Sequence, residues 1–270
     1  MGNNVNFGMA EVNGIEMPYA KVCGGNGSSG KSLVILPGLS VKQVTPIAEA
    51  VGNLYQPFLD DGYSIYLFDR RTNAAGSYTV FDMAEDTSVV MKAISIEKAD
   101  IFGASQGGMI AACIAITHPE LVDHLMIGSS VARHNEYSDA IFRRWISLAM
   151  EKRERELAVD IGSATYSKAS WDANGELIIT ANANVTDEEY ARFIQMAEAL
   201  LSFDFMGRLK ETDCRTLIIG SEGDMVFSPE YVRETTEAFS CESFFYGAGY
   251  GHAVYDEAPD YIERLYAFCH

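Results

Sequence analysis

Gly103-Ala104-Ser105-Gln106-Gly107-Gly108 is the stretch that decides the fold of this chain. It follows an apolar run from Ala99 to Phe102 and precedes a helix-like run from Met109 to Thr117. This order predicts a strand, a sharp turn and a helix, with a serine at the apex of the turn. The glycines on either side of Ser105 allow the turn because they carry no side chain that would clash across it.

The pattern Gly-x-Ser-x-Gly in this setting is typical of a nucleophile elbow. The turn would present the Ser105 hydroxyl at the carboxyl edge of a sheet, above a helix N-terminus that favours developing negative charge. The alternative is a chance glycine and serine turn, since a five-residue match is weak evidence by itself. The flanking strand and helix favour the elbow, and Ser105 is therefore the candidate nucleophile.

A serine nucleophile needs a base, and the base needs a carboxylate that orients it. Of the five histidines, His252 alone sits on a glycine-rich loop after the last predicted strand, Cys241 to Tyr246. Asp224 follows another predicted strand, Arg215 to Gly220. The chain order serine, acid, histidine makes Asp224 the expected acid and His252 the expected base.

Two other carboxylates are weighed against Asp224. Glu222 lies two residues earlier, but the Gly-x-x-Asp spacing places Asp224 beyond the strand tip. In another arrangement the acid follows the strand after the elbow helix, and here that strand meets no acid until Glu136. The sequence favours Asp224 over both.

With these segments in view, the chain resembles the α/β-hydrolase superfamily over nearly its full length. The resemblance rests on the elbow, on the Asp224 and His252 segments, and on two further stretches, Leu36-Pro37-Gly38-Leu39 and Phe68-Asp69-Arg70-Arg71. It implies a mostly parallel eight-stranded sheet with helices on both faces and a helical cap insertion. It also implies that the backbone N–H groups of Leu39 and Gln106 form an oxyanion hole. Many members have His-Gly where this chain has Pro-Gly, which removes any polar role of that histidine.

The alternation of strands and helices also predicts a parallel sheet covered on both faces. Asn13-Gly14 joins two alternating runs and predicts an antiparallel hairpin at one edge. Val44 to Leu59 has the spacing of one helix. From about residue 133 the pattern becomes helical and charged, with Asn135 and Thr186 as helix caps, until strands resume at Arg215. We therefore expect a core of residues 1–132 and 206–270 and a cap of residues 133–205.

The composition of the chain limits the classes of partner that the protein is expected to bind. The 270 residues carry a net charge of −18, which repels nucleic acid and anionic membranes. The five cysteines have no metal-type spacing, and no stretch is long and apolar enough to span a bilayer. The N-terminus has no secretory signal pattern. We expect a cytoplasmic protein with a small-molecule substrate and with no metal, cofactor, nucleic-acid or membrane partner.

Gly25 to Ser32 matches the P-loop expression Gly-x4-Gly-Lys-Ser. A phosphate cradle needs a helix that starts at the Lys-Ser pair, but here an apolar run from Leu33 to Leu36 and then Pro37 follow. We therefore read the match as a glycine-rich loop, and nucleotide binding stays only as a disfavoured alternative.

The leading hypothesis is a cofactor-independent serine hydrolase that cleaves a small ester, thioester or lactone through an acyl-enzyme. The same three residues would also serve a carbon–carbon bond hydrolase or a cofactor-free perhydrolase. Halide removal is disfavoured because that chemistry usually places an aspartate at the elbow. A different class of hypothesis is a ligand-binding or regulatory protein on the same fold, because a fold does not fix a function.

Overall fold

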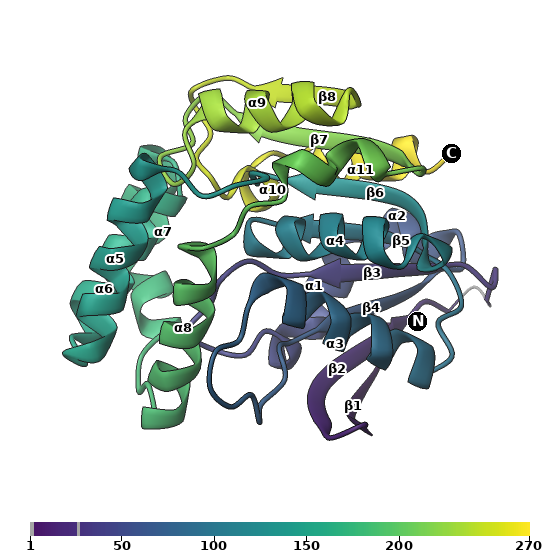
Figure 1. Cartoon of the computed structure of the whole chain (residues 1–270), viewed down its shortest axis with the longest axis horizontal. Helices are drawn as coiled ribbons and strands as arrows, with labels where there is room; N and C mark the ends of the chain where they lie inside the picture. Colours follow the sequence, from purple (N-terminus) through teal and green to yellow (C-terminus); the bar gives the residue numbers. More distant parts are fainter. Residues whose placement is uncertain (1–2, 26–27) are drawn as a thin grey trace.

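The structure is a computed structural model that describes residues 3–25 and 28–270. Within these ranges, eight strands form one sheet in the order β1-β2-β4-β3-β5-β6-β7-β8 (Figure 1). β2 runs antiparallel to both of its neighbours, and all pairs from β4 to β8 are parallel. The predicted mixed, mostly parallel sheet is confirmed. The strands are β1 (Asn4–Val12), β2 (Ile15–Cys23), β3 (Ser32–Leu36), β4 (Ser64–Phe68), β5 (Ala99–Ala104), β6 (Val122–Gly128), β7 (Arg215–Ser221) and β8 (Glu242–Tyr246).

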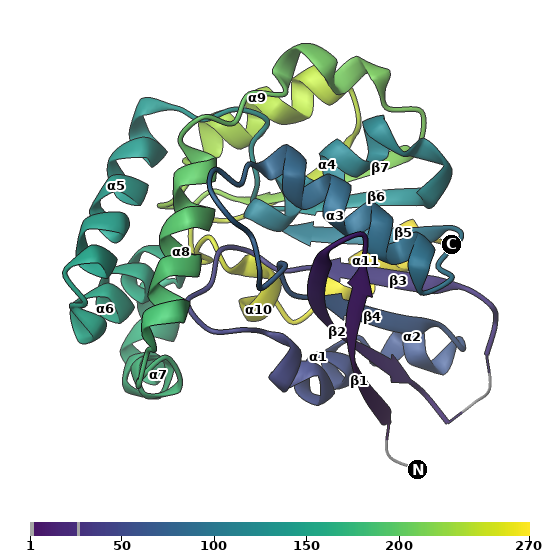
Figure 2. The ribbon, with the colours of Figure 1, turned by 60° about the horizontal axis from the view of Figure 1, so that its bottom comes forward.

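Helices cover both faces of the sheet, and the strands alternate their side chains between two apolar cores. Val34 of β3 faces the core beneath α3 and α4, whereas Leu33 faces the core beneath α1, α2 and α11. Figure 2 shows these helices on opposite sides of the strands. The helices are α1 (Ala48–Leu54), α2 (Gln56–Asp60), α3 (Val80–Ala93), α4 (Gln106–Thr117), α5 (Glu136–Met150), α6 (Glu154–Thr165), α7 (Lys168–Ala181), α8 (Asp187–Leu200), α9 (Pro229–Phe239), α10 (Val254–Glu257) and α11 (Tyr261–Phe268), with short 3-10 turns at Thr45–Ile47, Pro119–Leu121 and Met206–Glu211.

The edge hairpin forms as its turn residues predict. β1 and β2 pair in register from Asn4 opposite Cys23 to Val12 opposite Ile15. Asn13 and Gly14 both have positive φ, 51° and 79°. Two such residues form the tight turn whose twist matches an antiparallel pair.

The prediction of one helix from Val44 to Leu59 is wrong. The segment breaks into a 3-10 turn at Thr45–Ile47 followed by α1 and α2. Pro57 explains the second break, because proline lacks the backbone N–H that would continue α1 through this position. The apolar spacing persists across the breaks, and that spacing suggested a single helix.

Four helices, α5 to α8, interrupt the alternation between β6 and β7. Asn135 caps α5 by accepting from the Ser138 N–H at 3.0 Å. A capping box of Thr186 and Glu189 opens α8, as predicted. Figures 1 and 2 show the four helices together at the end of the sheet toward which the parallel strands run. In the described ranges, no helix is both long and apolar enough to cross a membrane.

Candidate active site

The turn between β5 and α4 places Ser105 in a strained backbone conformation with positive φ, at φ 53° and ψ −122°. Glycine is required on both sides: a Cβ on Gly103 would lie 2.2 Å from the Gly107 carbonyl oxygen, and a Cβ on Gly107 would lie 1.9 Å from the Leu36 carbonyl oxygen. The Ser105 N–H donates to the Gly128 carbonyl of β6 at 2.8 Å, and the Ser130 hydroxyl donates to the Ser105 carbonyl at 2.7 Å. These contacts fix the serine at the N-terminus of α4.

Asp224 and His252 meet although 28 positions separate them in the sequence. Asp224 follows β7, and His252 lies in the loop after β8. The Nδ1–H of His252 donates to Asp224 Oδ2 at 2.9 Å, and both side chains are buried. The second carboxylate oxygen of Asp224 accepts the N–H groups of Val226 and Phe227 at 2.8 and 3.0 Å.

The environment of Asp224 keeps its carboxyl group ionised. Burial acts to raise its pKa, but the charge and hydrogen bond of His252 and the two backbone N–H groups lower the pKa below its ordinary value. Because the carboxylate occupies Nδ1, the lone pair of a neutral ring lies on Nε2. That nitrogen is therefore the one available to accept a proton.

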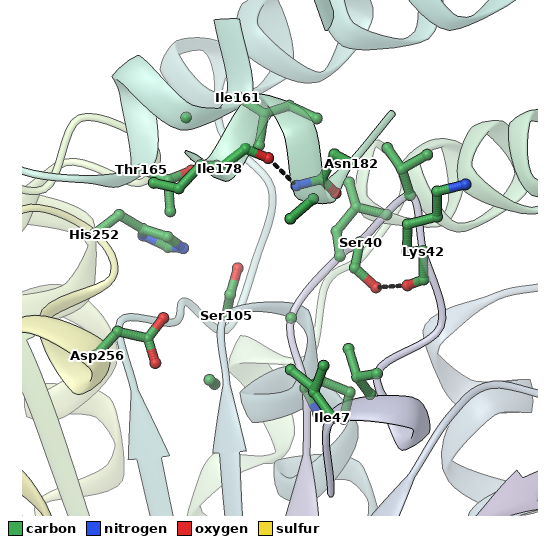
Figure 3. A pocket seen from close by; sticks show the side chains of 18 of the residues that line it. Ser40, Lys42, Ile47, Ser105, Ile161, Thr165, Ile178, Asn182, His252 and Asp256 are labelled. Carbon is green, nitrogen blue, oxygen red and sulfur yellow. Dashed lines mark hydrogen bonds between the residues drawn. The ribbon is translucent and has the colours of Figure 1, made fainter. Parts of the chain in front are cut away.

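Ser105 and His252 line the same cavity, which has a volume of about 410 Å³. Figure 3 shows the two side chains pointing toward each other across its floor. Among the described residues, neither the Ser105 hydroxyl nor His252 Nε2 has a hydrogen-bond partner. Such contacts are often long in an unliganded site and tighten when substrate binds.

The expected anion-binding amides lie beside the serine. Gly38, before Leu39, is so close to Ser105 that an added Cβ would lie 3.1 Å from the serine Cβ. In the part of the chain that the structure describes, the backbone N–H groups of Leu39 and Gln106 donate to no other protein group. Both remain free to donate to an oxygen at Ser105.

Two charged side chains at the end of β4 hold the loop that carries Leu39. The Asp69 carboxylate accepts the N–H groups of Val44 and Thr45 at 2.9 and 3.0 Å. Arg70 donates to the Pro37 carbonyl at 2.7 Å, and burial lowers the pKa of its guanidinium to about 10. The Asp-Arg pair after a strand was visible in the sequence, but its contact with this loop was not.

The side chain of Gln106 neither lines the cavity nor caps α4. Its amide donates to the Met196 carbonyl of α8 at 2.7 Å in a buried position. The residue after the candidate nucleophile therefore connects the elbow to the inserted helices.

The inserted helices form the far wall of the cavity. Their contribution is mostly apolar and includes Phe142, Trp145, Leu157, Ile161 and Ile178. Opposite them, the loop after β3 contributes Ser40 and Lys42, and α10 contributes Asp256 (Figure 3). Sequence reasoning singled out none of these three polar residues.

The competing candidates lie elsewhere. Glu222 is exposed and pairs with Arg233, and Glu136 is an exposed residue in the first turn of α5. At the P-loop-like segment, Ser32 begins β3, so no helix starts there. Asn26 and Gly27 of that segment lie outside the described residues.

One group of possible metal ligands is found among residues 3–25 and 28–270. Asp100, His124 and Cys269 place ligand atoms within 4.8 Å of one another. They lie near the amino ends of β5 and β6, away from Ser105. His124 already contacts Asp100 at 2.7 Å, and the Tyr63 hydroxyl donates to the other carboxylate oxygen at 2.9 Å. The group is therefore a satisfied hydrogen-bond cluster.

A family model described as "alpha/beta hydrolase fold" matches residues 32–259. The chain belongs to this family. The match includes the elbow, the Leu39 loop and both the Asp224 and His252 loops.

Individual relatives of this alpha/beta hydrolase are distant. The chain is 28% identical over 154 residues to "Putative carbamate hydrolase RutD" of Caulobacter segnis, a match that covers 56% of this chain and 57% of the relative. The solved structure of MGS-M2, an alpha/beta hydrolase enzyme from a Medee basin deep-sea metagenome library, superposes with a TM-score of 0.84 at 19% identity, covering 97% and 96% of the two chains. The enol-lactonase of Burkholderia xenovorans LB400 superposes with a TM-score of 0.79 at 17% identity, covering 97% and 99%. At these identities the structural likeness establishes the fold.

Proposed function

We propose that this alpha/beta hydrolase is a serine hydrolase that cleaves a small ester, thioester or lactone through an acyl-enzyme. The observation that carries the proposal is the 2.9 Å contact between Asp224 and His252 at the cavity onto which Ser105 opens. A buried acid oriented on one imidazole nitrogen, with the other nitrogen facing a strained serine, is the arrangement that activates a hydroxyl. We assign the cap role to residues 133–205, whose helices close the cavity.

The geometry supports the following sequence. Ser105 Oγ attacks the substrate carbonyl while His252 Nε2 takes the hydroxyl proton, and Asp224 stabilises the resulting imidazolium. The N–H groups of Leu39 and Gln106 donate to the oxygen that becomes negative, aided by the N-terminus of α4. His252 then gives its proton to the leaving alcohol or thiol. In the second half of the reaction, His252 takes a proton from water as the water attacks the acyl carbonyl. His252 then gives this proton to Ser105, which leaves as the free hydroxyl.

The cavity supports a compact and largely apolar substrate. Its volume of about 410 Å³ lies in the range of small-molecule sites. The names of the RutD relative and of the enol-lactonase add carbamates and lactones to the classes worth testing, since both contain a carbonyl that a serine can attack.

Labelling with a fluorophosphonate probe, together with a panel of acetate, butyrate, thioester, lactone and carbamate substrates, tests the proposal. We expect rapid labelling of the wild-type protein, none of Ser105→Ala, and wild-type labelling of Ser147→Ala, an exposed serine on α5. A folded wild-type protein that neither reacts with the probe nor hydrolyses any substrate would instead favour a ligand-binding protein on this fold.

A further inference from the structure

Asp256 places a carboxylate in the cavity beside the candidate nucleophile. It lies on α10, four residues after His252, and lines the same cavity. Figure 3 shows its side chain on one side of Ser105, with Ser40 and Lys42 on the other side. The Asp224–His252 pair described above does not use it, and it has no role in the steps at Ser105.

The carboxylate of Asp256 has no cationic partner within the part of the chain that the structure describes. Its side-chain contact is with the Tyr166 hydroxyl, which donates at the long distance of 3.5 Å. Lys42, the lysine that lines this cavity, pairs instead with Glu189 at 2.7 Å. The charge on Asp256 is therefore left without a counter-charge from the protein.

The neighbouring carboxylate behaves differently. Glu257 accepts the backbone N–H groups of Ser167 and Gly251 at 2.9 and 2.8 Å, and so joins the start of α7 to the loop before His252. Glu257 therefore has a structural role that accounts for its charge. No comparable set of donors satisfies Asp256 among the described residues.

The surroundings of Asp256 make its ionisation unfavourable. Asp256 is an exposed residue, and it lines the mostly apolar cavity that also holds Ser105. Burial raises its pKa to about 6, the Tyr166 hydrogen bond opposes this rise, and the charge of Glu257 adds to it. The other titratable groups around Asp256 are His252, one carboxylate and four tyrosines. The carboxylate is Glu257, and the tyrosines are Tyr55, Tyr166, Tyr255 and Tyr261.

An ionised carboxylate that lacks a counter-charge and lines a mostly apolar cavity attracts a ligand cation that enters the cavity. We propose that Asp256 is a specificity-determining residue that binds a cationic amino or ammonium group of the substrate that Ser105 attacks. This inference rests on the proposed function. It narrows the substrate class to esters and related acyl compounds that carry a positively charged nitrogen.

Pairs of isosteric substrates separate the effect of the positive charge on kcat/KM from the effect of size and shape. Acetylcholine and dimethylbutyl acetate differ by a carbon in place of the charged nitrogen, and the p-nitrophenyl esters of γ-trimethylammoniobutyrate and of its carbon isostere place the charge on the acyl side. We expect wild-type kcat/KM to favour the charged member of at least one pair by roughly tenfold, the size of a charge-assisted contact in a partly wet site.

Asp256→Asn should bring that ratio close to one, because the loss of kcat/KM should fall mainly on the charged ester. Glu263→Gln is the matched control, because Glu263 is an exposed carboxylate on α11 that has no partner among the described residues. It removes the same unit of charge and should leave the ratio unchanged.

The quaternary ammonium does not titrate, so any pH dependence of the preference belongs to the protein. We expect the wild-type preference to fall as the pH decreases through about 6, where Asp256 becomes neutral. In Asp256→Asn the ratio should be flat with pH. A ratio of one or below for both pairs in the wild-type protein would overturn the proposal, as would equal losses for charged and neutral esters in Asp256→Asn.

A binding measurement separates this inference from the proposed function. Calorimetric titration of choline and of uncharged dimethylbutanol into Ser105→Ala requires no catalysis. Choline binding that depends on Asp256 supports the cation site even if wild-type Ser105 fails to react with a fluorophosphonate. If Asp256→Asn does not fold, the wild-type ratios and the preference for choline over dimethylbutanol decide the question. Indifference to charge in both measurements overturns the cation site while leaving the hydrolase proposal standing.

Discussion

A Cβ on Gly107 would lie 1.9 Å from the carbonyl oxygen of Leu36. The helix that follows the candidate nucleophile therefore packs directly against the end of the neighbouring strand β3. The same approach brings the loop after β3, with Leu39, next to Ser105. The close packing of α4 on β3 therefore also places the Leu39 and Gln106 amides, the proposed oxyanion hole, beside Ser105.

Gly107→Ala should destabilise the protein by at least about 3 kcal/mol, because backbone atoms rather than a flexible side chain occupy the space. Gly207→Ala is the matched control, since an added Cβ there has no neighbour within 4 Å. Urea unfolding curves of both variants measure the difference. Near-equal midpoints would show that α4 and β3 are less closely packed than described.

Ser105→Ala and His252→Ala should each lower kcat/KM by roughly 10⁴-fold, and the double variant should lose little more. The reason is that the base has no function without the hydroxyl that it deprotonates. Steady-state kinetics on the best ester of the panel give the three ratios. Losses that multiply in the double variant would mean that the two residues act independently.

Asp224→Asn should leave the protein folded but reduce turnover by orders of magnitude, because the imidazole loses the carboxylate that orients it and stabilises its charge. Glu222→Gln, whose exposed carboxylate pairs with Arg233, should change turnover by less than about twofold. The kcat values of the two variants form the comparison. The reverse order would assign the acid to Glu222, and two silent substitutions would exclude a triad mechanism.

Asp256→Asn should raise stability at pH 8 by up to about 1 kcal/mol, well below the full pKa shift, because Asp256 is exposed and water screens its charge. Burial raises the folded-state pKa from the ordinary 3.8 to about 6, so the folded protein holds this proton more tightly than the unfolded chain. Wild-type stability is therefore lost as the pH rises from about 4 through 6. The gain of the variant should shrink toward zero by pH 4. Urea unfolding from pH 4 to pH 8 measures it, and a gain independent of pH would contradict this explanation.

Local patterns made much of the sheet and the elbow predictable. The Asn13-Gly14 turn, the Thr186 capping box and the strand before Ser105 each depend on residues that are near one another in the sequence. The spacing from Val44 to Leu59 misled because apolar periodicity continues across the interruption at Pro57. Periodicity reports which face is buried and is less sensitive to breaks in the helix.

The position of Asp256 could not be predicted from the sequence. α10 spans four residues, which is too short for a pattern to indicate which side chain faces the cavity. Among the described residues Asp256 has no cationic partner, and this depends on the tertiary contact in which Lys42 pairs with Glu189 instead. Similarly, the contact of Gln106 with Met196 joins segments 90 positions apart.

The order of the strands along the chain, with β5 before the inserted helices and β7 and β8 after them, also has a consequence for biosynthesis. Ser105 leaves the ribosome well before the strands that lead to Asp224 and His252, and the four inserted helices lengthen that delay. A growing chain thus carries Ser105 before His252, its proposed base, and before the cavity has formed. If the proposed mechanism holds, Ser105 becomes reactive only when β7 and β8 add to the sheet, and a chain truncated before them should not hydrolyse esters.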